Sequence, residues 1–138
     1  SSSSRQTTCS CEVNMALSLT SSVADVGGTL AFQTSATAAI DTLKGSSGTL
    51  YKVEIDNTAN SVAVFVKLYN NGGGAPTAGS TDPNFVFKCA ASSTIAYSCP
   101  SGTAFANALY AICVTTAGTA GTASQNPEVA VTYRILYT

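Results

Sequence analysis

The sequence predicts an all-β protein, an antiparallel β-sandwich that is jelly-roll-like and carries an extended N-terminal arm. Apolar and polar residues alternate with the two-residue period of strands, and no window shows an apolar repeat at three and four residues. Thr, which favours strands, makes up 19 of the 138 residues. Eight or nine candidate strands follow one another at roughly ten-residue spacing, as in two-layer β folds.

Two segments give the clearest strand patterns. In residues 50–57, alternation places Tyr51, Val53 and Ile55 on one face and charged side chains on the other. Residues 61–69 are nearly all apolar and β-branched, which is typical of a central strand covered on both faces. The four residues 57–60 between these strands have turn composition and predict a hairpin.

Seven more segments complete the expected strand set, and the patterns at 29–34 and 38–44 are the weaker ones. Further strands are predicted at 13–19, 29–34, 38–44, 84–88, 92–98, 109–115 and 128–137. The expected buried residues include Val53, Ile55, Val64, Val66, Phe85, Phe87, Ile112, Val129 and Val131.

The length of the protein favours one domain, because 138 residues bury one sizeable core and leave little for a second. We expect residues 13–138 to form this domain. Residues 1–12 are small and polar without hydrophobic periodicity, which predicts an arm that contacts another chain. The candidate partner contacts in the arm are Ser1, Arg5, Gln6, Cys9 and Cys11.

Charge is scarce along the whole sequence. Only 9% of residues are charged and the formal net charge is -1, with the six Lys and Arg residues scattered. No basic cluster is available for nucleic acid, and no apolar run reaches the roughly 18 residues needed to span a membrane. Ser and Thr together supply 37 residues of neutral polarity. Such a surface favours close contact with another protein, because few charges must be desolvated.

The sequence contains few of the residues that catalysis requires. The sequence has no His, so Ser-His-Asp and Cys-His nucleophile arrangements are impossible. Glu54 and Asp56 share a strand face and form the closest approach to a carboxylate pair, but a solvated charged stripe with Lys52 explains them better. We therefore expect no enzyme activity and no cofactor or metal.

Two loops exceed ordinary turn length, at residues 70–83 and 116–127, and loops this long are often functional. An ordinary crossover between sheets explains them equally well. Gly72, Gly73 and Gly74 lack the Lys-Ser or helix start of a phosphate loop and mark a loop tip. Together with Thr119 and Thr122, they are candidate partner contacts.

The five cysteines leave at least one thiol free or paired between chains. Cys113 lies in an apolar strand and is the natural buried free thiol. Cys89 and Cys99 could close a local disulfide, and Cys9 or Cys11 could fasten the arm. An entirely reduced set fits the sequence as well.

Several phrases resemble small structural proteins of tailed bacteriophages, particularly those of cyanobacterial phages. They span residues 50–137 and include YKVEIDNTAN at 51–60, VFVKLY at 64–69, APT at 75–77, PNFVF at 83–87 and VTTAGTAG at 114–121. The resemblance implies a capsid cement or decoration protein that binds the major capsid protein on the outer surface of the head. It would be made in the host cytoplasm and become part of the virion.

The resemblance also implies a homo-oligomer, with a trimer favoured over a dimer, because many decoration proteins occupy threefold positions. Neither nucleic acid nor a membrane is an expected partner. The alternative is a receptor- or carbohydrate-binding module on a tail or fibre, with the two long loops as its binding edge. Six Tyr and no Trp offer little for sugar stacking.

Overall fold

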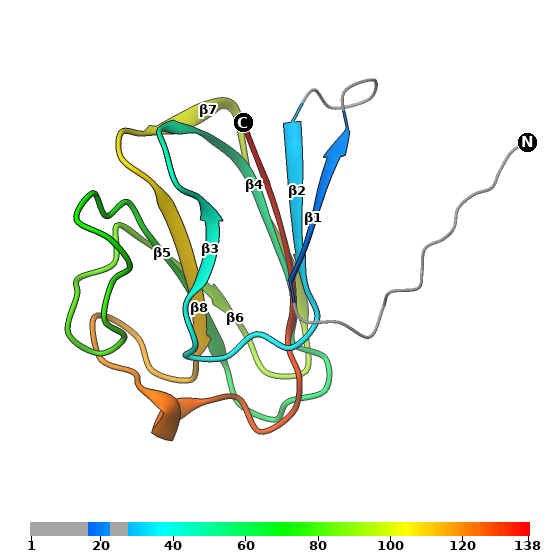
Figure 1. The fold of residues 1–138 in the computed structure, drawn as a ribbon. Coiled ribbons are helices and arrows are strands. Elements are labelled where there is room, and N and C mark those ends of the chain that lie inside the picture. Colours follow the sequence, from blue (N-terminus) through cyan, green and yellow to red (C-terminus); the bar gives the residue numbers. More distant parts are fainter. Residues whose placement is uncertain (1–16, 23–27) are drawn as a thin grey trace, which may run out of the picture.

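The computed structural model describes residues 17–22 and 28–138 and confirms an all-β protein (Figure 1). Within these ranges the strands are β1 Leu17–Ser22, β2 Gly28–Gln33, β3 Asp41–Lys44, β4 Gly48–Asp56, β5 Val64–Tyr69, β6 Phe85–Cys89, β7 Thr94–Phe105, β8 Leu109–Val114 and β9 Thr132–Tyr137. A short 3-10 helix, Ala123–Gln125, interrupts the last long loop. The arm at 1–12 and most of the strand expected at 13–19 lie outside the described residues.

The strands form two antiparallel sheets. Sheet A has the order β1-β2-β9-β4-β7, and sheet B has the order β3-β8-β5-β6. The main core contains buried apolar residues of both sheets. Because successive side chains of a strand alternate between faces, β9 sends Tyr133, Ile135 and Tyr137 into this core.

The expected hairpin at residues 57–60 is wrong. β4 belongs to sheet A and β5 to sheet B, so the backbone crosses between the sheets at this point. The residues there do have turn composition, but an apolar pattern on both flanking strands does not say whether they pair with each other. β5 is nevertheless a central strand and is buried on both faces, as the sequence predicts.

Two buried carboxamides hold this crossing. The Asn57 Nδ2 donates to the backbone oxygens of Val62 and Ala90 at 2.9 and 3.0 Å. The Asn60 Nδ2 donates to Asn57 Oδ1 at 3.0 Å and to Val129 O at 2.9 Å, while Asn60 Oδ1 accepts from Val129 N at 2.9 Å. Three segments that are distant in sequence therefore meet at one pair of side chains.

A second polar link joins the sheets at β3. The carboxylate of Asp41, on β3, accepts from Gln33 Nε2 at 2.9 Å and from the Tyr133 hydroxyl at 2.5 Å, and both donors belong to sheet A. Nearby, the Tyr137 hydroxyl donates to Leu43 O at 2.6 Å. These bonds satisfy polar groups that burial would otherwise leave costly.

The expected core is mostly confirmed. The buried members are Val53, Ile55, Val64, Val66, Ile112 and Val131. Phe85 and Phe87 are only partly buried and pack against the core from edge strand β6. The prediction that Val129 is buried is wrong, because this residue is 48% exposed in the loop that precedes β9. That loop is fastened through backbone atoms of Val129, so its side chain is free to face solvent.

Replacing Asn57 by Ala should lower the free energy of unfolding by about 3 kcal/mol, because the Val62 and Ala90 carbonyl oxygens lose their donor and the buried Asn60 Nδ2 loses its acceptor. Urea denaturation measures the change. Asn107→Ala is the matched control, since Asn107 is exposed, and it should cost well under 1 kcal/mol. Similar losses in the two variants would contradict a structural role for the Asn57 carboxamide.

Candidate functional site

Different residues cover the outer faces of the two sheets. The outer face of sheet B carries a second apolar cluster, whose buried members are Ala38, Tyr69, Ala108, Tyr110, Ile112 and Val114. The two long loops, β5 to β6 and β8 to β9, lie beside this sheet in Figure 1. Ala78, from the first loop, packs on the cluster. The protein thus uses its own loops to cover this face.

Lys67 fixes the second loop over sheet B. It is 0% exposed, although β5 presents it on the outer face, and its Nζ donates to Ala120 O. Burial lowers the pKa of this ammonium group. Beside it, Gly121 has φ +125°, and a Cβ there would lie 2.7 Å from a methyl group of Val114. The loop backbone therefore rests directly on the sheet.

Two of the expected loop contacts, Thr119 and Thr122, lie where the two long loops meet. The Thr119 hydroxyl donates to Asp82 Oδ1 at 2.5 Å, and the Thr122 side chain accepts from Ser124 N at the start of the 3-10 helix. Both threonines therefore stabilise the protein's own loops. The remaining candidates in this region, Gly72, Gly73 and Gly74, are exposed at the tip of the first loop.

The candidates Ser1, Arg5, Gln6, Cys9 and Cys11 lie outside the described residues. Partner contact by any of the expected residues stays a prediction.

The outer face of sheet A carries charges instead of loops. Lys52 Nζ and Glu54 Oε2 form an ion pair at 3.1 Å on β4. Arg134, opposite Glu54 in the register of β9, places its guanidinium 4.5 Å from the centre of the Phe32 ring on β2. A cation above an aromatic face is attracted by the ring and loses some of its mobility. Three neighbouring strands thus contribute to one charged surface.

Asp56 ends this stripe and remains ionised. Its carboxylate accepts from the Thr58 hydroxyl at 2.6 Å and from Thr58 N at 3.0 Å. These bonds lower the pKa of Asp56, and the nearby charge of Arg134 lowers it further. A carboxylate with a lowered pKa is a poor general acid at neutral pH.

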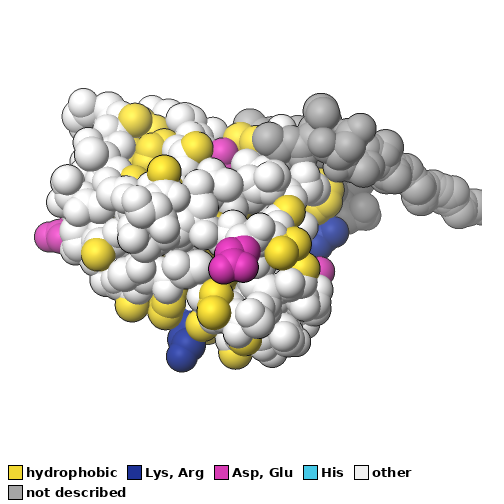
Figure 2. Space-filling model, turned by 90° about the horizontal axis from the view of Figure 1, so that it is seen from below, with side chains coloured by type: hydrophobic (Ala, Val, Ile, Leu, Met, Phe, Trp, Pro, Cys, Tyr) yellow, Lys and Arg dark blue, Asp and Glu magenta, His cyan; other side chains and the backbone are white. Residues whose placement is uncertain are grey.

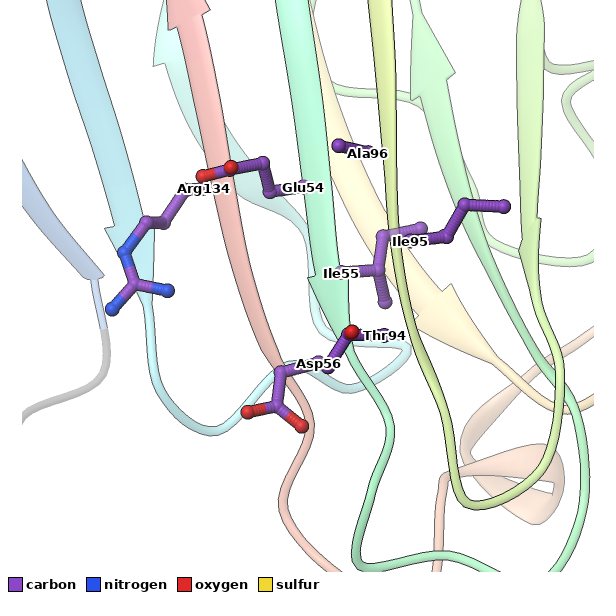
Figure 3. A pocket seen from close by; sticks show the side chains of 7 residues that line it. All are labelled: Glu54, Ile55, Asp56, Thr94, Ile95, Ala96 and Arg134. Carbon is purple, nitrogen blue, oxygen red and sulfur yellow. The ribbon is translucent and has the colours of Figure 1, made fainter.

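A shallow hollow opens beside these charges (Figure 3). Its lining residues are Glu54, Ile55, Asp56, Thr94, Ile95, Ala96 and Arg134. In Figure 3 the Arg134 side chain extends toward β2, while β7 forms the opposite rim. A second hollow is lined by Tyr51, Lys52, Ser98, Cys99, Pro100, Leu136 and Thr138. This face offers both charge signs, hydroxyls and apolar carbons to a partner, which suits contact with another polar surface.

The Cys89–Cys99 disulfide considered from the sequence is not formed. Both residues, and Cys113, are free thiols. The Cys89 Sγ lies in the core and contacts Ser93 O at 3.4 Å, whereas Cys99 is partly exposed at the second hollow. Cys113 is buried and free, as expected from its apolar neighbours.

Sequence reasoning missed the asparagines as connectors. The Asn70 Oδ1 accepts from Asn107 N at 2.8 Å and from Ala108 N at 3.2 Å, and the Asn126 Oδ1 accepts from Ala38 N at 2.8 Å. The available signal was the position of Asn at loop boundaries, where its amide satisfies free backbone groups.

Two other kinds of feature are absent from residues 17–22 and 28–138. There, no three His, Cys, Asp or Glu side chains gather as metal ligands. In the same residues, no helix has the length and hydrophobicity to cross a membrane.

No family model, curated protein or solved structure matches this protein. Its function is therefore inferred from its own residues and geometry.

Gly121→Ala should lower the free energy of unfolding by about 3 kcal/mol, because the new methyl group would collide with Val114 at a positive φ. Gly118→Ala is the matched control: its φ is also positive, at +67°, but open space surrounds the position. The control should cost about 1 kcal/mol. Urea denaturation compares the two, and equal losses would mean that the loop does not rest on sheet B.

Stability should fall in alkaline solution because of Cys113. Burial raises the pKa of its thiol from 9.0 to about 12, so the folded state retains a proton that the unfolded state releases. This contribution is fully present below pH 9.0 and is lost as the pH rises toward about 12, up to about 4 kcal/mol. Cys113→Ala should flatten the alkaline decline in unfolding free energy, whereas the surface variant Cys99→Ala should preserve it. An unchanged slope in Cys113→Ala would refute the assignment.

Proposed function

We propose that this protein is a non-enzymatic structural component of a tailed-bacteriophage virion, a capsid cement or decoration protein on the outer head surface. It would stabilise the shell by bridging neighbouring major capsid subunits. The observation that carries the proposal is the unequal cover of the two sheets. Sheet B uses its outer face to hold the protein's own loops, whereas sheet A presents charges and two hollows.

The strand order supports a jelly-roll-like sandwich as the scaffold. After β1, the order β2-β9-β4-β7 in one sheet and β3-β8-β5-β6 in the other matches two four-stranded sheets with crossovers between them. Jelly rolls occur in many viral structural proteins, although the fold alone does not define a function.

The surface suits permanent contact with a protein shell. Figure 2 shows one end of the molecule, where isolated charged side chains lie among neutral polar atoms and small hydrophobic areas. Val62 and Val129 are 47% and 48% exposed, and both belong to segments fastened by Asn57 and Asn60. Rigid, weakly charged segments lose little entropy and little hydration on binding.

Assembly on a repeating shell would multiply modest contacts. Several attachment points that are held together raise the overall avidity without any new kind of interaction. We propose a homo-oligomer, a trimer rather than a dimer, at a threefold position. The resemblance to phage proteins supports the trimer, and closed cyclic symmetry uses one repeated interface.

A receptor- or carbohydrate-binding module on a tail or fibre is the second candidate. The observation that favours it is the hollow of Figure 3, where two carboxylates and a threonine surround a recess. Carboxylates and hydroxyls at a recess are suitable acceptors and donors for sugar hydroxyl groups.

Variants of sheet A test the proposed capsid contact. Arg134→Glu reverses a charge on the exposed face and should weaken binding to capsids stripped of this protein by about tenfold. Lys88→Glu, on the exposed part of edge strand β6, is the charge-matched control and should bind normally. Arg134→Gln separates loss of the cation from new repulsion beside Glu54, and thermal unfolding verifies that each variant is folded.

Electron microscopy of the purified particles supplies the independent test. Density for the protein on the outer head, with the face of sheet A toward the major capsid protein, is the expected result. Density at a tail tip, together with glycan binding that Arg134→Gln abolishes, would replace the proposal by the second candidate.

A further inference from the structure

The tip of the β5 to β6 loop combines an Asn-Gly sequence with an open backbone. Asn71 is followed by Gly72, and Gly72, Gly73 and Gly74 are exposed. A Cβ placed on Gly73 or Gly74 would meet no atom within 4 Å, and Gly74 has φ +111°. Backbone rearrangement at this tip therefore meets little steric resistance.

We propose that Asn71 is a site of spontaneous deamidation, a covalent modification that is independent of the proposed function. The Gly72 backbone nitrogen loses its proton and attacks Asn71 Cγ. The new bond between these two atoms closes a five-membered succinimide as the Cγ–Nδ2 bond of Asn71 breaks and ammonia leaves. Water then opens the ring to aspartate or isoaspartate.

The attacking nitrogen is free to react. Gly72 N–H donates no hydrogen bond to any described residue, and glycine has no side chain to hinder closure of the ring. The Asn71 carboxamide donates through Nδ2 to Gly74 O at 2.7 Å, a single exposed bond that a side-chain rotation breaks. Its Oδ1 accepts no hydrogen bond from the described residues.

Other asparagines are held in ways that oppose the same reaction. The Oδ1 atoms of Asn57, Asn60, Asn70, Asn84 and Asn126 all accept structural hydrogen bonds. Asn126 also precedes Pro127, whose nitrogen has no proton to lose. Asn107 is exposed but precedes Ala108, whose N–H is bonded to Asn70 Oδ1. Among the asparagines that the structure describes, the fold thus selects Asn71.

The modification would change the loop tip in two respects. It adds one negative charge to a protein whose formal net charge is -1. The isoaspartate product also inserts the Cβ of residue 71 into the backbone next to Asn70, whose side chain holds the start of β8 through Asn107 N and Ala108 N.

Peptide mapping of the folded, full-length protein tests the proposal. After incubation in mildly alkaline buffer, the residue 71 position should gain about one dalton, at least about tenfold faster than Asn84 in the same tryptic peptide or Asn107 elsewhere. Asn71 and Asn84 share a peptide because Lys67 and Lys88 flank them. Equal rates at the three positions, or no gain at Asn71, would overturn the proposal.

Two variants isolate the chemistry. Gly72→Ala should slow the mass gain by about tenfold, because a methyl group hinders attack. Its Cβ would lie 3.0 Å from Asn107 Cγ, so a second variant that leaves Gly72 unchanged separates the chemistry from a shift of the loop. Asn71→Gln provides the second variant, because its longer side chain must close a less favourable six-membered ring, and it should suppress the gain. Persistence of the gain in Asn71→Gln would refute the assignment.

Discussion

The fold depends on the crossing held by Asn57 and Asn60. At this point the backbone leaves sheet A for sheet B, and it must also accommodate the segments that lead into β7 and β9. Backbone groups in such a crossing cannot pair within a sheet, so side chains must satisfy them. An amide donates and accepts at once and carries no charge to desolvate, which makes it well suited to this buried position. The carboxamides of Asn57 and Asn60 therefore connect distant segments of this protein without using charged groups.

The outer faces of the two sheets differ because the long loops cover sheet B. The two long loops, which the sequence offered either as partner contacts or as ordinary crossovers, cover sheet B and are held there by hydrogen bonds of Lys67 and Asp82. Sheet A keeps its outer face available, with the Arg134 guanidinium ordered over Phe32. The contact surface that we propose is therefore the flat side of sheet A, with the core behind it.

Strand positions could be predicted because alternation is a local property. Val53 and Ile55 follow the two-residue period and are buried, and the continuous apolar run of β5 correctly indicated cover on both faces. Strand pairing was harder to predict from the sequence. Whether the turn at 57–60 joins two paired strands or crosses between the sheets depends on strands that are distant in sequence. The charged face of β4 was likewise visible in the sequence, but the approach of Arg134 and Phe32 to it required the sheet order.

The place of β9 in sheet A has a consequence for how the molecule forms. This last strand lies between β2 and β4, which come much earlier in the sequence. Until β9 arrives, β2 and β4 lack their shared neighbour, and the buried side chains Tyr133 and Ile135 are missing from the core. Contacts between residues so distant in sequence slow folding, because the intervening residues must be ordered before they form. During synthesis, sheet A would therefore close only after β9 leaves the ribosome, and the apolar side chains of the earlier strands would need protection from aggregation until then.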